Sequence, residues 1–162
     1  MAIPFFALLF AIFETAIDFY AGQMLQSATW DAACQIMTGQ VQSGGAITSA
    51  TQFRDQLICP KIFGMVTCSN IQVDARVVTQ FTASEVSKPF TNGSFNTANF
   101  EFCPGGPGQI VVVRAVYPMP ILTSLFGLSG TTTVNGSTVR VLMGVAAFQN
   151  EPFPPTTPLP GC

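Results

Sequence analysis

Histidine is absent from the sequence, and charge of either sign is scarce: 6 Lys and Arg and 8 Asp and Glu are spread over 162 residues. Charged residues make up 9% of the chain, whereas an ordinary soluble domain has about 25%. A chain with so little charge either contains a membrane segment or covers much of its surface with partners. The net charge of −2 argues against nucleic acid as a partner, because nucleic-acid binding requires basic patches.

The residue patterns of enzymes and metal sites are missing as well. Without histidine the chain has no imidazole base or zinc ligand, and its cysteines form no C-x-x-C pair. It also has no G-x-S-x-G motif and no phosphate-binding loop. We therefore expect the protein not to be an enzyme and to use no cofactor, metal or small-molecule substrate.

The N-terminal segment has no basic residue, because the first Lys or Arg of the chain is Arg54. It has no charge at all before Glu14 and Asp18, and its apolar residues fall on every side of a helix. This pattern predicts a helix surrounded by apolar material. The uncharged run spans about 20 Å as a helix, less than the roughly 30 Å of a bilayer core. The residues that we expect to face a membrane are Ile3, Phe5, Phe6, Leu8, Leu9, Phe10, Ile12 and Phe13.

Two other interpretations of this segment stay open. A cleaved signal peptide would have a basic start and a small-x-small cleavage site, but aromatic residues stand at Phe19 and Tyr20. A buried helix of a soluble protein would show a polar face, and none is present before Ala21. We therefore favour the membrane helix.

The pattern becomes amphipathic after Gly22, which predicts that the same helix continues to a total of about 35 residues and ends near Gly39. We expect a flexible connector over 41–46 and a second short helix that begins at Thr48 or Ser49. Ser49 and Gln52 have the spacing of a capping box, and Phe53 and Leu57 should point inward.

The rest of the chain predicts strands and loops. Residues 70–79 alternate as a half-buried strand does, and the β-branched run 109–117 predicts a central strand that Pro118 and Pro120 end. Residues 131–148 predict a hairpin around Asn135-Gly136. Asp74 and Arg76 alternate on one strand face, which favours a solvated surface. The region 82–108 is expected to be loop, with turns at 92–93 and 104–108, and the Pro-rich end to be extended.

Five cysteines in a chain of this length suggest an oxidising compartment. We favour a bridge between Cys59 and Cys68, which flank a short loop and whose pairing would stabilise the fold by about 2.7 kcal/mol on the chain-entropy estimate. Cys34 is equally compatible with a buried free thiol.

Five stretches in order carry a resemblance to a known family. They are IPFFALLFAIFET, DAACQIMTGQVQ, QFRDQLIC followed by CSNIQVDARV, PGGPGQIVVVRAVYPMP, and VLMGVAAFQNEPF. Their order and spacing resemble the TadE/TadG family, the small pilin-like proteins of tight-adherence (Tad) type IV pilus machines. The resemblance covers nearly all of residues 2–153.

The resemblance implies a pilin-like α+β fold: a long N-terminal transmembrane helix, a short second helix and a small antiparallel sheet of three to four strands packed on the helix. Residues 1–22 would form the membrane-anchoring half of the helix. Residues 23–153 would form the head, which includes the rear half of the helix, and residues 154–162 a Pro-rich tail.

The implied function is that of a structural or assembly component, a minor pilin or pseudopilin, of a Tad type IV pilus. Such a subunit is a single-pass protein of the bacterial inner membrane with its head on the periplasmic side, and it packs with sister pilin-like subunits and the Tad assembly machinery. An alternative from another class is an exported adhesin or periplasmic binding domain with a removable N-terminal segment.

The resemblance also bears on Glu14, Asp18 and the remaining cysteines. One of the two acids would pair with a cation or terminus of a partner subunit, or both would mark where the helix leaves the lipid. Cys59 and Cys68 match the family's cysteine pair. Cys34 and Cys103 do not, which suggests that they pair with each other and leave Cys162 unpaired.

Members of the family usually begin with a basic stretch, a glycine and a Val-Glu-Phe-Ala segment, just before the position of Ile3. We therefore expect the natural chain to begin upstream of Met1. The additional residues would complete the roughly 30 Å span and supply a basic anchor.

Overall fold

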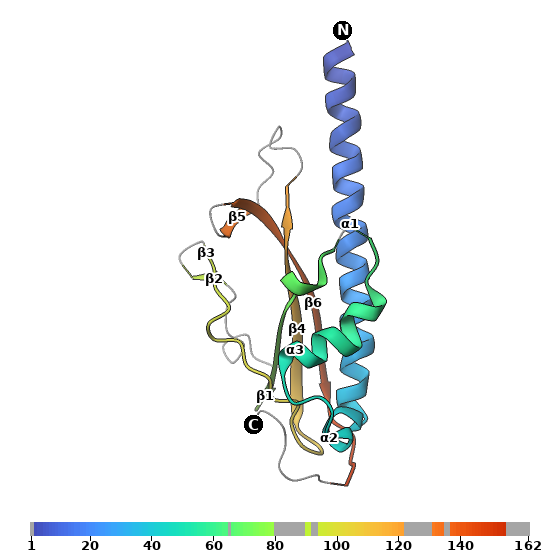
Figure 1. Ribbon diagram of the computed structural model, residues 1–162, viewed down its shortest axis with the longest axis vertical. Helices are drawn as coiled ribbons and strands as arrows, with labels where there is room; N and C mark the ends of the chain where they lie inside the picture. Colours follow the sequence, from blue (N-terminus) through green and yellow to red (C-terminus); the bar gives the residue numbers. More distant parts are fainter. Residues whose placement is uncertain are drawn as a thin grey trace.

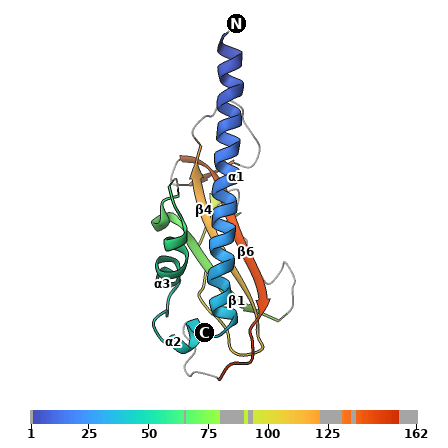
Figure 2. The same cartoon turned by 90° about the vertical axis from the view of Figure 1, so that its right-hand side faces the viewer.

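The computed structural model describes residues 2–64, 66–79, 90–91, 94–121, 131–134 and 137–154. Its dominant element is the 36-residue helix α1 (Ala2–Met37), which confirms the predicted long N-terminal helix. The front half of α1 stands clear of the other elements, and the rear half lies along the sheet (Figure 1). Figure 2, turned by 90°, shows α1 running across one face of the sheet, so that the head consists of a helix layer and a sheet layer.

Over the described residues the sheet has six strands in the order β1-β4-β6-β5-β3-β2. Three long strands, β1 (Gln72–Val78), β4 (Ile110–Pro120) and β6 (Ser137–Gln149), form its antiparallel centre. The three short strands are β5 (Thr131–Val134), β3 (Ser94–Phe95) and β2 (Phe90–Thr91). The α+β layout is as predicted, but β2 and β3 lie in the region expected to be loop. Strands this short cannot show a period in the sequence.

Strand β4 continues past the predicted end at residue 117, runs through Pro118 and ends at Pro120. Pro118 is paired with Val141 and Pro120 with Val139 of β6, whereas β1 pairs with β4 only as far as Val116. Beyond Val116 one edge of β4 therefore has no neighbouring long strand. A proline, which has no N–H to donate, is tolerated at such an edge.

The predicted hairpin of residues 131–148 is confirmed, because β5 and β6 pair antiparallel with Val134 opposite Ser137. The turn dipeptides Asn135-Gly136 and Asn92-Gly93 lie outside the described residues, as does the chain beyond Pro154.

Short helices join α1 to the sheet. The expected connector 41–46 is wrong in part, because α2 (Gln40–Gly44) forms there. Its Gln42 is buried and donates hydrogen bonds to the carbonyls of Ile36, Pro104 and Gly105 at 3.0–3.2 Å. These hydrogen bonds fix the conformation of a turn that the local sequence alone does not specify.

The predicted second helix is confirmed as α3 (Ala50–Phe53), which continues as a π-helical turn, η1 (Arg54–Ile58), and a 3₁₀ turn, η2 (Cys59–Lys61). A further 3₁₀ turn, η3 (Cys68–Asn70), precedes β1. The Ser49 hydroxyl accepts a hydrogen bond from the Gln52 N–H at 3.3 Å, and the Gln52 side chain accepts from the Thr48 N–H at 2.8 Å. Phe53 is fully buried and Leu57 packs against the core, both as expected.

The core fills the space between the rear half of α1 and the sheet. Its largest fully buried members include Leu25 and Ile36 of α1 and Val113 of β4. The helix and β6 approach very closely at Gly144, where a Cβ atom would lie 2.5 Å from Thr29 Oγ1 and 2.9 Å from the Leu25 carbonyl oxygen. Only glycine allows this approach.

The helix is also joined to β6 by polar contacts. The Gln26 side-chain amide donates to the Val145 carbonyl at 2.9 Å and accepts from the Val145 N–H at 3.0 Å. Strand β5 pairs with β6 only over residues 137–140, so Val145 lies at an open edge of β6. Gln26 supplies the hydrogen bonds that a neighbouring strand would otherwise make there.

Candidate functional site

The front half of α1 is the most unusual surface of the protein. One helix, Ile3–Met37, is long and apolar enough to cross a membrane by length and composition. No residue of its most apolar 18-residue window is buried within the protein. Of the residues predicted to face a membrane, Leu9 is half-buried, and the others are exposed: Ile3, Phe5, Phe6, Leu8, Phe10, Ile12 and Phe13.

This segment satisfies its own polar groups. Thr15 donates its hydroxyl hydrogen to the carbonyl of Ala11, four residues earlier, at 2.8 Å. A helix also pairs its backbone N–H and C=O groups internally, which is what a segment without water around it requires. The segment can therefore lie in an apolar environment without leaving these groups unpaired.

The exposed half of α1 joins the head at Asp18. Its carboxylate forms an ion pair with Arg140 of β6, and both residues are half-buried. Within this chain the cation beside Asp18 is therefore Arg140, and pairing of Asp18 with a partner subunit stays a prediction. No local pattern in the sequence indicates this pair, because the two residues are 122 positions apart and only the packing of α1 on β6 brings them together.

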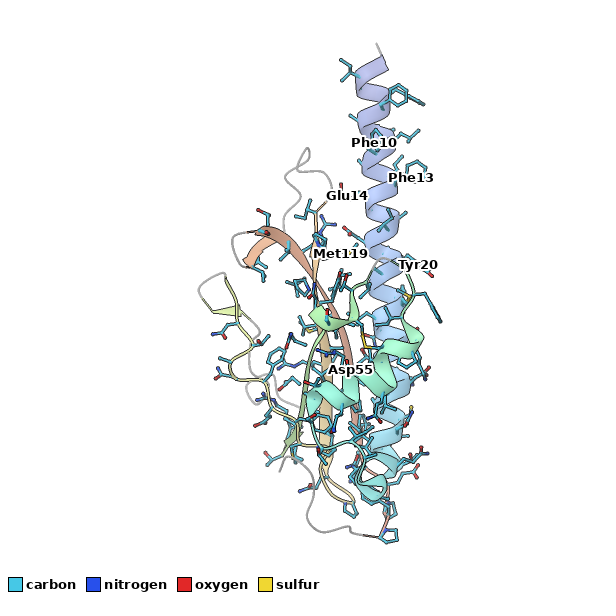
Figure 3. All side chains as sticks on the ribbon, viewed as in Figure 1. Phe10, Phe13, Glu14, Tyr20, Asp55 and Met119 are labelled. Atoms are coloured by element: carbon cyan, nitrogen blue, oxygen red, sulfur yellow. A yellow bond between two sulfur atoms is a disulfide. The ribbon has the colours of Figure 1, made fainter. Side chains whose placement is uncertain are left out.

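Glu14 precedes Asp18 by one helical turn, so the two acids share a face of α1. Figure 3 shows Glu14 on the side of α1 that carries the sheet and Tyr20 on the opposite side. Glu14 is half-buried. Its pairing with a neighbouring subunit stays a prediction.

A second polar cluster lies within the sheet and was predicted wrongly. Asp74 was expected on a solvated face but is fully buried. Its Oδ1 lies 2.6 Å from Nη2 of Arg76. Its Oδ2 accepts two hydrogen bonds from Arg114, the residue directly opposite on β4, one of them from Nε at 3.0 Å. A buried carboxylate needs such partners, because an unpaired buried charge is strongly destabilising.

The same cluster fixes the segment that runs beside β1. Asp74 Oδ1 accepts from the Glu101 N–H at 3.0 Å, and Arg76 Nη2 donates to the Asn99 carbonyl at 2.8 Å. The Arg114 guanidinium lies 5.3 Å from the centre of the Phe100 ring, a cation–π distance.

The charge of Arg76 is stabilised by this arrangement. Burial lowers the pKa of Arg76, but the hydrogen bond and charge of Asp74, with the charge of Glu101, outweigh it and raise that pKa above its usual value. Asp74 and Arg114, which are buried, and Arg76, which is half-buried, all have structural partners. We therefore assign the cluster to the fold and not to catalysis.

The cysteines divide into one confirmed and one incorrect prediction. Cys59 and Cys68 form the predicted disulfide, with their Cα atoms 5.7 Å apart. Cys34 and Cys103 do not pair, because Cys34 is a free thiol and Cys103 is itself disulfide-bonded. Cys162 lies outside the described residues. Asp55 lies close to Cys59 and Cys68, but their sulfurs are joined in the disulfide and offer no thiolate to a metal.

The hollows on the described surface include two of several hundred Å³. A groove of about 600 Å³ runs along α1 beside the disulfide loop and is lined by residues that include Tyr20, Met24 and Phe63. A cleft of about 500 Å³ lies near the start of β1 and is lined by uncharged residues that include Asn70, Gln72 and Ser137. The groove also has Asp31 and Lys61 in its lining, and these two side chains form an ion pair with each other at 2.9 Å.

Comparison with known proteins finds no match: no family model, no curated protein and no solved structure matches the chain.

Proposed function

We propose that the protein is a membrane-anchored, pilin-like subunit that serves in the structure or assembly of a Tad type IV pilus, as a minor pilin or pseudopilin of the TadE/TadG kind. The front half of α1 would lie in the bacterial inner membrane, with the head on the periplasmic side. Sister pilin-like subunits and the assembly machinery would be its partners.

One observation carries this proposal: a single unbroken helix is exposed and apolar in its front half and forms a layer of the head in its rear half. Such a helix couples an anchor rigidly to a folded domain. Transfer of the anchor from lipid into a bundle of similar helices changes its apolar surroundings little, so packing and polar contacts would decide which subunits associate.

The stretches that resemble the family also occupy the centre of the fold. The stretch PGGPGQIVVVRAVYPMP contains β4, CSNIQVDARV contains most of β1, and VLMGVAAFQNEPF contains most of β6. A resemblance confined to a loop would say little about the fold. This one falls on the three long strands and on α1, and it therefore supports a common architecture.

The disulfide supports the exported location of the head. Disulfides form and persist in oxidising compartments such as the bacterial periplasm. Cys59 and Cys68 lie in the head, far along the chain from the exposed part of α1, so the proposed topology places them on the oxidising side of the membrane.

Membrane fractionation of cells that express the chain from its own locus tests the proposal. We expect the protein in the carbonate-resistant membrane fraction or in sheared surface fibres, and deletion of its gene should reduce piliation. A soluble periplasmic species that is shorter by about 20 residues, the length of a typical signal segment, would contradict it.

That second result would favour the alternative of an exported binding domain. The cleft of about 500 Å³ is the feature that favours it, because its lining consists mainly of hydroxyl, amide and proline groups without charge. Such a lining fits a neutral ligand rich in hydrogen-bonding groups.

A further inference from the structure

The loop closed by the Cys59–Cys68 disulfide has an apolar tip at residues 62–64. The loop sequence over 62–66 is IFGMV, where turns usually carry polar residues. Ile62 packs against the core and Val66 is buried, but Phe63 between them has 69% of its surface exposed. Gly64, with φ +83, forms a bend directly after Phe63. The backbone therefore holds a large aromatic side chain outward on a covalently closed loop.

This tip lies beside the point where α1 leaves the head. The Phe63 N–H donates to Met24 Sδ at 3.4 Å, and Phe63 and Tyr20 line the same groove. Figure 3 shows Tyr20 on the side of α1 that faces away from the sheet. Tyr20 is 65% exposed, and Phe19 next to it is exposed as well. Phe19, Tyr20 and Phe63 are thus three exposed aromatic residues near the point where the apolar front half of α1 leaves the head.

The kinds of side chain near the tip also fit one kind of partner. Lys61 is 41% exposed, which makes it the most exposed of the basic side chains paired within the described part of the chain. Its partner Asp31 lies at 2.9 Å and is also exposed, so this ion pair holds the lysine weakly. An exposed lysine beside exposed aromatic rings is the combination found where proteins meet lipid headgroups.

We infer that the tip 62–64, with Phe63 at its outermost point, is a second membrane contact that rests on the lipid headgroups beside the anchor helix. The inference rests on the proposed membrane anchor. A single helix can rotate about its own axis and tilt in a bilayer, because the lipid around it is alike on all sides. A second contact away from that axis sets which side of the head faces the membrane and which sides face neighbouring subunits.

Tryptophan fluorescence in vesicles tests this contact. The full chain with Phe63→Trp and Trp30→Phe is reconstituted into phosphatidylethanolamine and phosphatidylglycerol vesicles, some of which contain lipids with a spin label at the headgroup. The matched control is the unaltered chain, whose Trp30 is exposed on the same helix about 15 Å further from the anchor than Tyr20. We expect the emission of the introduced tryptophan to shift to the blue and to be quenched by the labelled lipid. Trp30 in the control should stay accessible to iodide in the water.

The outcomes separate this inference from the proposal beneath it. If the chain fails to float with the vesicles, the proposed membrane anchor is wrong, and the inferred second contact is then wrong as well. If the chain floats but iodide quenches the introduced tryptophan and Trp30 alike, the anchor stands and the loop contact is wrong. Protection of the introduced tryptophan that rises with protein concentration, without quenching by labelled lipid, would also contradict the inference and would point to a protein partner.

A measurement on the unaltered chain covers the case in which the substituted protein does not fold. Vesicles that contain a photoreactive phospholipid headgroup are illuminated, and the reduced protein is digested with trypsin. We expect lipid adducts on the peptide that begins at Ile62, directly after Lys61, in excess over the peptide that begins at Val141 and contains most of β6. Equal labelling of the two peptides would overturn the inference.

Discussion

The two halves of α1 belong to one continuous helix and lie in opposite environments. Leu8 in the front half is 60% exposed, and Leu25 in the rear half is fully buried, although both are leucines of one continuous helix. The front half carries large side chains such as Phe10 and Phe13 on its open surface. The rear half buries many small ones, including Ala28 and Ala32, against the sheet.

This difference shows that apolar content alone does not decide where a helix lies. Small side chains let the sheet come close, as at Gly144, and close approach provides the packing that holds the rear half. Large side chains on every face prevent any one neighbour from covering the front half. The size and distribution of the apolar residues, and not only their number, thus separate the exposed segment from the packed one.

The largest expected effect comes from truncating the same residue type in each half. Leu25→Ala should lower the free energy of unfolding by about 2–5 kcal/mol, because it leaves a cavity under the sheet. Leu8→Ala, the matched control, should change it by less than about 0.5 kcal/mol, because Leu8 is exposed on the front half. Denaturant unfolding in mild detergent, followed by Trp30 fluorescence, measures both. Equal effects would mean that the head does not depend on the rear half of α1.

The close approach of α1 and β6 is the next target. Gly144→Ala should destabilise the head by about 1–3 kcal/mol, because the new Cβ meets Thr29 Oγ1 at 2.5 Å and the helix has to move. Gly22→Ala is the control, since a Cβ at Gly22 has nothing within 4 Å, and it should stabilise the helix by up to about 1 kcal/mol. Thermal unfolding of the two variants should therefore shift in opposite directions. A shift in the same direction would contradict the close packing.

A smaller effect is expected where α1 closes the open edge of β6. Gln26→Ala removes two hydrogen bonds to Val145, and water can replace part of them, so the expected loss is about 1 kcal/mol. Gln23→Ala, about one turn away on the helix, should be nearly neutral, because Gln23 is exposed. Hydrogen exchange provides the specific readout: the Val145 amide should exchange faster in the Gln26 variant alone.

Much of the fold could be predicted from the sequence because its main elements are long. A helix of 36 residues and strands of 7 to 13 residues show their periods clearly. The elements that escaped prediction, α2, β2 and β3, have two to five residues. The structure of α2 depends on distant contacts, those of Gln42 with Pro104 and Gly105.

The candidate site was predictable in part for the same reason. The apolar front half and the Cys59–Cys68 bridge follow from local sequence. The burial of Asp74 does not, because alternating polar residues on a strand usually face water. The available signal was Arg114, a charged residue inside a β-branched run, since a charge in a central strand requires a buried partner.

The smallest expected effect lies at the boundary between the two halves, in the ion pair of Asp18 and Arg140. A double-mutant cycle with Asp18→Asn and Arg140→Gln should give a coupling of about 1 kcal/mol or less in detergent, because the gain of an ion pair near water is offset by desolvation and side-chain ordering. A pair that is so easily broken has a consequence for assembly. A neighbouring subunit that offered a better cation could take Asp18 from Arg140 without unfolding the head. Piliation by cells that carry the Asp18→Asn chain distinguishes the two roles. Normal pili with unchanged membrane insertion indicate that Asp18 pairs only within its own chain. Loss of pili with normal insertion indicates that the Asp18 carboxylate also binds a neighbouring subunit.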